Sequence, residues 1–129
     1  MAMLSKPTLG ITHDHAKKLA NVKVTGTITF TRFELAQMKD GLRFKLKCSL
    51  WGADSGLTGA DDFLYTLSSK YYPDASPNQV ETYTFEVTLG EGVLDEDWGT
   101  DEVYAKVRLI NLYTLVAVTK NSNTVSHSF

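Results

Sequence analysis

The stretch Leu42-Arg43-Phe44-Lys45-Leu46-Lys47-Cys48-Ser49-Leu50 decides the fold class of this chain. Its apolar side chains alternate with basic and polar ones, which is the two-residue period of a β-strand. An antiparallel sheet with one buried face and one solvated face produces this pattern. The stretch therefore predicts a half-buried strand with Cys48 on the core side.

Similar alternation recurs on both sides of this stretch, and segments rich in Gly, Asp, Asn and Pro separate the repeats. The alternating segments are residues 22–30, 63–67, 82–89, 103–109, 115–119 and 125–129. Strands at this spacing without amphipathic helices between them are typical of an antiparallel sandwich or barrel. We therefore predict an all-β fold, an antiparallel β-sandwich of seven to eight strands.

The domain organisation follows from where the alternation begins. Val22 is the first strongly periodic residue, so we expect residues 1–21 to form a partly ordered N-terminal leader and residues 22–129 to form a single β-sandwich domain. The alternation changes phase between Phe30 and Phe33, where we expect a bulge, a bend or a crossing between sheets. Asp40-Gly41 then predicts a tight turn, because glycine accepts a positive φ.

Composition excludes several classes of protein. The net charge of -2 argues against a general nucleic-acid-binding protein, which would carry a basic excess. Cys48 is the single cysteine, so neither an intramolecular disulfide nor a cysteine-ligated zinc site is expected. The chain contains no apolar run long enough to span a membrane and no signal-peptide core, so we expect a soluble protein of unknown compartment.

The strand count, the length and the stretch Ser122-Asn123-Thr124-Val125-Ser126 resemble those of bacterial immunoglobulin-like and fibronectin type III-like sandwiches. The resemblance covers most of the chain in architecture and its last strand in residues, and it implies an immunoglobulin-like β-sandwich. Two features depart from the family. Lys106 stands where an immunoglobulin domain carries a cysteine, and Tyr104 shares the outward parity of Lys106 and Arg108, unlike the tyrosine of a tyrosine corner. A likeness at the level of the fold implies no function.

Two acidic loops form the first candidate site. Residues 52–62 supply Asp54, Asp61 and Asp62, and residues 90–102 supply Asp95 and Asp97. Calcium takes six to eight oxygen ligands, so these five carboxylates are candidate calcium ligands if the loops meet. The alternative is a solvated acidic surface, because Asp is also common in turns.

The segment His13-Asp14-His15 forms a second candidate site. In an extended segment the two imidazoles point to the same side and are able to share a divalent metal ion. The sequence does not reveal a third ligand, so an exposed leader is the simpler interpretation.

Aromatic residues in loops or at strand ends form a third candidate, a surface for a ligand or a partner: Trp51, Tyr71, Tyr72, Trp98 and Tyr113. Such side chains stack on sugar rings or anchor protein interfaces. The alternative is that they fold over the core. A fourth set comprises basic residues that would share one face if their strands are neighbours, and we interpret it as an ordinary solvated face: Arg43, Lys45, Lys47, Lys106 and Arg108.

The chain contains no nucleophile elbow, phosphate-binding loop or zinc-protease motif, so we do not expect an enzyme. The leading hypothesis is a non-catalytic binding or assembly module with recognition loops 52–62 and 90–102, which includes a homo-oligomeric structural protein. Its partner would be another protein or a second copy, and no nucleic acid. The alternative is a calcium- or carbohydrate-binding module that uses the acidic loops; no other cofactor is expected. A small β-fold enzyme is the second alternative.

Overall fold

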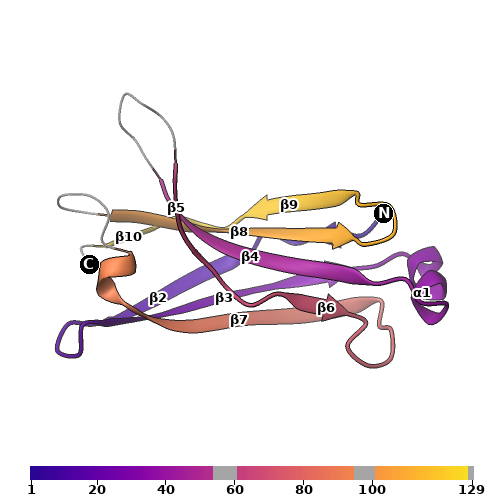
Figure 1. The fold of residues 1–129 in the computed structure, drawn as a ribbon, viewed down its shortest axis with the longest axis horizontal. Helices are drawn as coiled ribbons and strands as arrows, with labels where there is room; N and C mark the ends of the chain where they lie inside the picture. The colour runs from indigo at the N-terminus through magenta and orange to yellow at the C-terminus, as the bar shows by residue number, and fades with distance from the viewer. Residues whose placement is uncertain (54–60, 95–100, 128–129) are drawn as a thin grey trace.

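The computed structural model describes residues 1–53, 61–94 and 101–127, and its strands run mainly along the longest axis of the molecule (Figure 1). In the first sheet, β3 (Leu19–Thr29) is the central strand, and β7 (Val80–Gly90) pairs antiparallel along one of its edges. Two strands share the other edge of β3, β1 (Met3–Leu4) and β2 (Thr8–Asp14), and both are antiparallel to it.

The second sheet is built around the antiparallel pair of β4 (Phe44–Gly52) and β8 (Asp101–Asn111). Two short strands continue along the outer edge of each member of this pair. They are β5 (Asp62–Thr66) and β6 (Lys70–Tyr72) beside β4, and β9 (Ala117–Asn121) and β10 (Val125–His127) beside β8. All pairings among the described residues are antiparallel, as the sequence predicts.

The core lies between the two sheets and forms one cluster of buried side chains. The inward residues of β4 belong to the stretch with the cleanest alternation, and Leu46, Cys48 and Leu50 are fully buried. Buried residues of both sheets meet in this cluster, among them Val22, Val24, Ile28, Phe85, Val103, Val107 and Leu109. Burial raises the pKa of the Cys48 thiol to about 12, which keeps the thiol protonated and unreactive at neutral pH.

The phase change after Phe30 marks a helix, so the prediction of a bulge or bend there was wrong, whereas the predicted crossing between sheets is confirmed, because β3 and β4 on either side of the helix belong to different sheets. The helix α1 (Arg32–Lys39) begins at Thr31, whose side-chain oxygen accepts the Glu34 N–H at 3.1 Å, while Glu34 Oε1 accepts the Thr31 N–H at 2.8 Å. This reciprocal pair is a capping box, which fixes the start of a helix. The predicted turn follows α1, and Gly41 has a φ of 111°.

The assignment of residues 1–21 to a leader requires a correction. β1, β2 and the start of β3 lie in this segment, and β2 pairs with β3 over its whole length. Leu9 is buried in the core, which explains why the segment joins the sheet. The short 3-10 helix η1 (Glu91–Val93) follows β7. Among the described residues, no helix is long and apolar enough to cross a membrane.

Asn123 and Ser122, in the connection between β9 and β10, join the second sheet to the edge of the first. The Asn123 side-chain oxygen accepts the Leu9 N–H at 2.8 Å, and its side-chain nitrogen donates to the Leu9 carbonyl at 3.1 Å. The Ser122 hydroxyl accepts the Ala105 N–H at 2.8 Å and donates to the Asn123 carbonyl. These bonds close one side of the sandwich, where the last strands pass β2.

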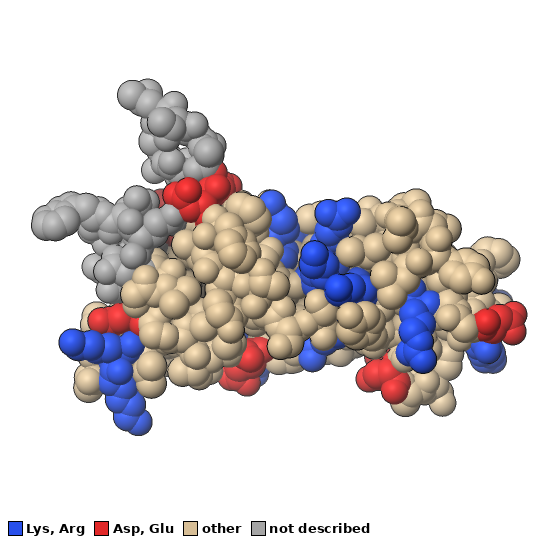
Figure 2. All heavy atoms as spheres, in the orientation of Figure 1, with Lys and Arg blue, Asp and Glu red and all other residues tan. Residues whose placement is uncertain are grey.

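The basic residues of β4 and β8 do lie on neighbouring strands, because Lys47 pairs with Arg108 and Ser49 pairs with Lys106. Figure 2 shows Lys and Arg side chains gathered over the middle of the face in view. Lys106 places its Nζ 4.3 Å from the centre of the Trp51 ring, a cation–π contact that covers one side of the indole.

Candidate functional site

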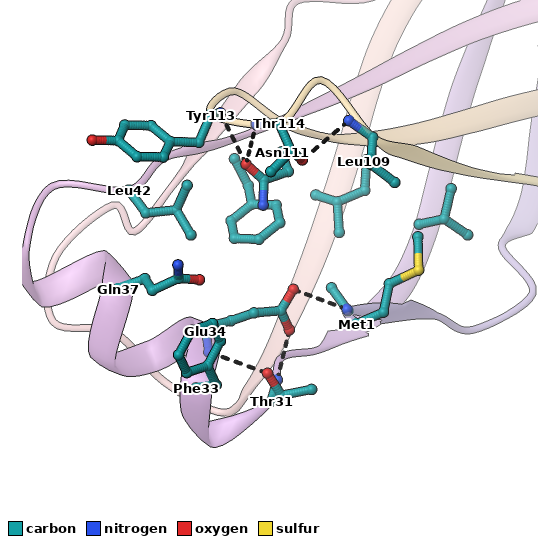
Figure 3. Close-up of a pocket in the computed structure, with 14 residues that line it drawn as sticks. Met1, Thr31, Phe33, Glu34, Gln37, Leu42, Leu109, Asn111, Tyr113 and Thr114 are labelled. Atoms are coloured by element: carbon teal, nitrogen blue, oxygen red, sulfur yellow. Dashed lines mark hydrogen bonds between the residues drawn. The ribbon is translucent and has the colours of Figure 1, made fainter.

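A cavity of about 330 Å³ opens at the end of the sandwich that carries α1 (Figure 3). The start of the chain, α1 and the connection between β8 and β9 surround it. Its inner wall comes from apolar side chains of β4, β8 and β9 and from a buried leucine two residues before β4, namely Phe44, Leu109, Val118 and Leu42. Figure 3 shows Gln37 and Leu42 directed toward the cavity and the Tyr113 ring directed away from it.

Glu34 is the charged residue in the wall of this cavity, and it is 8% exposed. Its Oε2 atom accepts the Ala2 N–H at 3.0 Å, while Oε1 accepts the Thr31 N–H. Backbone donors therefore satisfy both carboxylate oxygens, which stabilises a buried carboxylate. Glu34 thus fastens the start of the chain to α1, and this arrangement favours a structural role.

Hydrogen bonds within the connection between β8 and β9 fix its backbone, and several of its side chains point outward. The Asn111 side-chain oxygen accepts the N–H groups of Tyr113 and Thr114 at 2.9 and 3.1 Å, and the Asn111 carbonyl accepts the Leu115 N–H at 2.7 Å. Leu115 has a φ of 64°, an uncommon conformation for a leucine. The bonds to Asn111 hold this turn in place, with Tyr113 and Leu115 exposed at its tip.

Large apolar side chains surround the opening of the cavity and remain mostly exposed. We call this set the apolar rim, and its members are Met1 (71% exposed), Phe33 (72%), Tyr113 (81%) and Val116 (52%). All four line the cavity, so the rim and the cavity form one continuous surface. Clustered exposed apolar residues on a folded protein mark interaction sites more often than single ones do.

Of the predicted calcium ligands, Asp54, Asp95 and Asp97 lie outside the described residues. Asp61 accepts a hydrogen bond from the Tyr104 hydroxyl at 2.6 Å, and Asp62 is exposed at the start of β5. Burial, with a smaller contribution from Asp61, raises the pKa of the Tyr104 hydroxyl to about 12.

The strand ends that carry the two acidic loops are neighbours, because Gly52 pairs with Val103 and the Ala53 N–H donates to the Glu102 carbonyl at 2.8 Å. The described residues at which these two loops meet the second sheet therefore lie side by side. That the carboxylates of the two loops share a calcium ion stays a prediction.

The predicted aromatic surface is not one patch in the described residues. Trp51 is half-buried, and its indole N–H donates to Ser49 Oγ at 2.9 Å. Tyr71 is 49% exposed on β6, whereas Tyr72 is buried and its ring packs on Phe30, so Tyr72 is a core residue. Trp98 lies outside the described residues. Tyr113 is the most exposed of the four described members of the set and belongs to the apolar rim.

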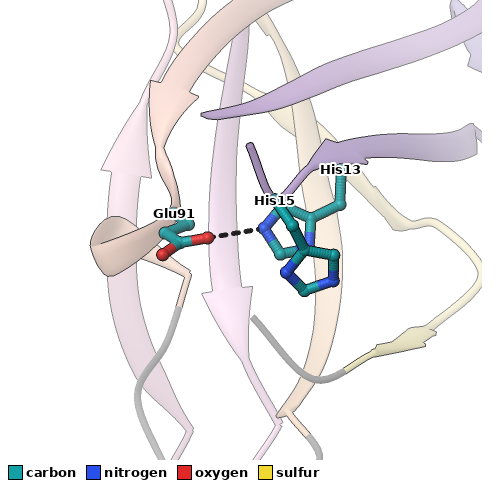
Figure 4. A group of neighbouring side chains, drawn as sticks. All are labelled: His13, His15 and Glu91. Atoms are coloured by element: carbon teal, nitrogen blue, oxygen red, sulfur yellow. Dashed lines mark hydrogen bonds and ion pairs between the residues drawn. The ribbon is translucent and has the colours of Figure 1, made fainter. Parts of the chain in front are cut away.

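The two histidines of the His13-Asp14-His15 segment meet a carboxylate (Figure 4), at the opposite end of the sandwich from α1 (Figure 1). His13 Nε2 lies 2.7 Å from Glu91 Oε2, and the rings of His13 and His15 have their centres 4.0 Å apart. Glu91, in η1, is the third candidate ligand that sequence reasoning missed. It lies 78 residues from His13, and the register of three strands brings it there.

The apolar rim was also missed, although one local signal for it exists. Thr31-Arg32-Phe33-Glu34 matches the Ser/Thr-x-x-Glu/Gln pattern of a capping box. Recognition of this helix start would have changed the assignment of Phe33 from a strand to a helix. Met1 and Val116 gave no such signal, because only the tertiary arrangement brings them to the cavity.

The comparisons with known proteins add little. No protein-family model matches the chain, and no curated protein matches it. Among solved structures, it is similar to one described as "X-ray structure of Northeast Structural Genomics Consortium target SoR45". The two are 11% identical with a TM-score of 0.41, over 98% of this chain and 85% of that one. At this identity and TM-score the similarity says nothing about function.

Proposed function

We propose that this protein is a non-catalytic binding module whose apolar rim and cavity bind an apolar segment of a protein partner. One observation carries the proposal, namely four largely exposed apolar side chains around a cavity of about 330 Å³. Half of the exposed large hydrophobic side chains of the described residues belong to residue 1, to α1 or to the connection between β8 and β9: Met1, Phe33, Leu112, Tyr113, Leu115 and Val116.

The size and the exposure of this surface favour a protein partner over a small molecule. The cavity is near the lower limit of small-molecule pockets, which begin at about 300 Å³. A small ligand inside it would leave the Tyr113 ring and Leu115 in water, whereas a protein surface would cover them together with the cavity. Tyr, Phe and Met are also side chains that protein interfaces favour.

Strand order supports an immunoglobulin-like assignment as part of the same proposal. One sheet has the order β2, β3, β7, and the other has β9 or β10, β8, β4, β5 or β6. In the immunoglobulin scheme, strands A, B and E share one sheet, and strands G, F, C and C′ share the other. We assign β2, β3, β4, β7 and β8 to A, B, C, E and F on this basis.

The test is selection of peptides from a random phage-displayed library on the purified full chain, followed by affinity measurement for the selected peptides. We expect apolar peptides whose binding falls at least about tenfold with Phe33→Ser or Tyr113→Ser, since central aromatic contacts contribute about 2 kcal/mol or more. Phe63→Ser is the matched control, because Phe63 is exposed on β5, away from the rim.

Two outcomes would overturn the proposal. One is a selection that yields no binding peptide. The other is a set of peptides that bind the Phe33→Ser and Tyr113→Ser variants as tightly as they bind the unmodified chain.

The earlier alternatives stay predictions. The calcium and carbohydrate hypotheses depend on Asp54, Asp95, Asp97 and Trp98, which lie outside the described residues. Self-association, the homo-oligomeric form of the leading hypothesis, would show as a concentration-dependent mass in light scattering. The small-enzyme hypothesis has no observation in its favour among the described residues.

A further inference from the structure

The cluster of His13, His15 and Glu91 rests on a backbone framework that fixes where its members lie. His13 pairs with Ala20 across β2 and β3, and Ala20 pairs with Leu89 across β3 and β7. The Glu91 N–H donates to the Lys18 carbonyl at 2.9 Å, which ties η1 to the turn between β2 and β3. The three candidate donors therefore lie at one corner of the first sheet.

The cluster is buried at His13 and exposed to solvent at His15. The His13 side chain is 3% exposed and the Glu91 side chain 26% exposed, whereas His15 is exposed. One ligand atom from each residue lies within 4.8 Å of the other two. Figure 4 shows the Glu91 carboxylate directed at the His13 ring and the two rings beside each other.

These distances are close to those that a metal ion requires. Ligands about 2.0–2.2 Å from a tetrahedral Zn²⁺ are roughly 3.4 Å apart. The closest pair, His13 Nε2 and Glu91 Oε2, must separate by less than about 1 Å, and the widest separation must shrink by at most about 1.4 Å. Rotation of the exposed His15 side chain supplies much of this adjustment, because exposed side chains change rotamer readily.

We propose that His13, His15 and Glu91 form a binding site for a divalent transition-metal ion of the Zn²⁺ class. Imidazole nitrogen suits zinc, nickel and copper, whereas calcium and magnesium prefer oxygen ligands only. Two imidazoles and one carboxylate supply three protein ligands, which leaves a further coordination position for water or a partner's side chain.

A hydrogen-bonded pair of His13 and Glu91 is the competing interpretation, because such a pair would also link β2 to η1. The two interpretations differ in what they require of His15. A simple pair needs no second imidazole, whereas a metal site needs His15 as a ligand. The decisive variants are therefore His15→Ala and Glu91→Gln, the second of which keeps a hydrogen-bond acceptor beside His13.

The test is calorimetric titration of ZnCl₂ into the full chain, purified without a polyhistidine tag and treated with EDTA. We expect one equivalent of Zn²⁺ to bind and to raise the melting temperature, since a ligand of the folded state stabilises it. Co²⁺ in place of Zn²⁺ should give visible absorption bands of a site with nitrogen and oxygen ligands, and an excess of Ca²⁺ should not displace Zn²⁺ from the site.

The variants decide between the two interpretations. We expect His15→Ala and Glu91→Gln each to weaken Zn²⁺ binding by at least about tenfold, because even lost support around a ligand costs 10–100-fold. Glu86→Gln is the matched control, because Glu86 is an exposed carboxylate on β7, and it should bind as the unmodified chain does. No Zn²⁺ heat at millimolar concentration, or binding that survives both variants, would overturn the proposal.

Discussion

Gly26 and Tyr83 form a cross-strand pair in which the ring occupies the space that a side chain on residue 26 would need. They are directly opposite each other in β3 and β7. A Cβ atom at position 26 would lie 2.7 Å from Tyr83 Cζ. Tyr83 is buried and packs edge to face on Phe85, so its ring has little room to move. Only glycine fits opposite Tyr83 without displacement of this ring.

We expect Gly26→Ala to lower the free energy of unfolding by about 1–3 kcal/mol, the usual cost of an overpacked core. Urea unfolding followed by circular dichroism measures the change. Gly10→Ala is the control, because no atom lies within 4 Å of a Cβ built there, and its effect should stay within about 0.5 kcal/mol. Equal stability of the two variants would show that the Tyr83 ring moves away at no cost.

At the scale of the element, α1 depends on the capping box and on the link from Glu34 to the start of the chain. We expect Thr31→Ala to lower the free energy of unfolding by about 1 kcal/mol through loss of the cap. Glu34→Ala should cost more, about 1–3 kcal/mol, because it leaves the N–H groups of Ala2 and Thr31 without their acceptor. Urea unfolding measures both.

Lys39→Ala is the control for α1, because Lys39 is exposed in the last turn of the helix. A Glu34→Ala variant as stable as Lys39→Ala would contradict the structural role of Glu34. Limited proteolysis gives a second measurement, since loss of the Ala2 bond should expose β1 to cleavage before the rest of the chain.

The strands with strong alternation were predictable from the sequence, because alternation reports directly which face of a strand is buried. β4, β7 and β8 lie where the pattern placed them. β2 was missed because its inward parity carries only two strongly apolar residues, Leu9 and Ile11, before the polar His13. α1 was missed because Phe33 and Leu35 fit strand periodicity, while the signal for a helix lies in Thr31 and Glu34.

The two candidate sites depend on contacts between distant segments, which local pattern does not report. The spacing of His13 and His15 indicated two ligands on one side of a strand, but the third ligand follows only from the pairing of β2, β3 and β7. In the same way, Met1 and Val116 reach one cavity through tertiary structure. For both sites, the sequence shows which side-chain types each segment carries, but it does not show which distant segments lie together in the fold.

At the scale of the whole molecule, the free energy of unfolding should fall at alkaline pH, because a buried thiol and two buried tyrosine hydroxyls keep their protons in the folded state. Burial raises the pKa of Cys48 to about 12 from 9.0, and that of Tyr72 and Tyr104 to about 12 from 10.0, with help from nearby carboxylates for the tyrosines. At a pH between the ordinary pKa of each group and its raised pKa, the folded state retains a proton that the unfolded chain releases. The free energy of unfolding therefore falls as pH rises from about 9 to about 12.

Urea unfolding at several values between about pH 8 and pH 11.5 measures this dependence, with a limiting slope of about 1.4 kcal/mol per pH unit for each proton retained. Cys48→Ala should make the decline start nearer pH 10, because the thiol is the group that titrates first in the unfolded chain. A free energy of unfolding that stays constant up to about pH 11 would contradict the protected state of these groups.

The bonds between Asn123 and Leu9 also constrain the order in which the chain is able to fold. These residues lie 114 positions apart, so the closure waits until nearly the whole chain is available. β2 and β3 are adjacent in the chain and are able to pair early, whereas β3 with β7 and β4 with β8 join distant segments. Distant contacts carry a loop-closure cost and slow folding. A chain emerging from the ribosome therefore holds an unfinished sandwich until its last strands appear, with the edge of β2 uncovered at Leu9 for that whole interval.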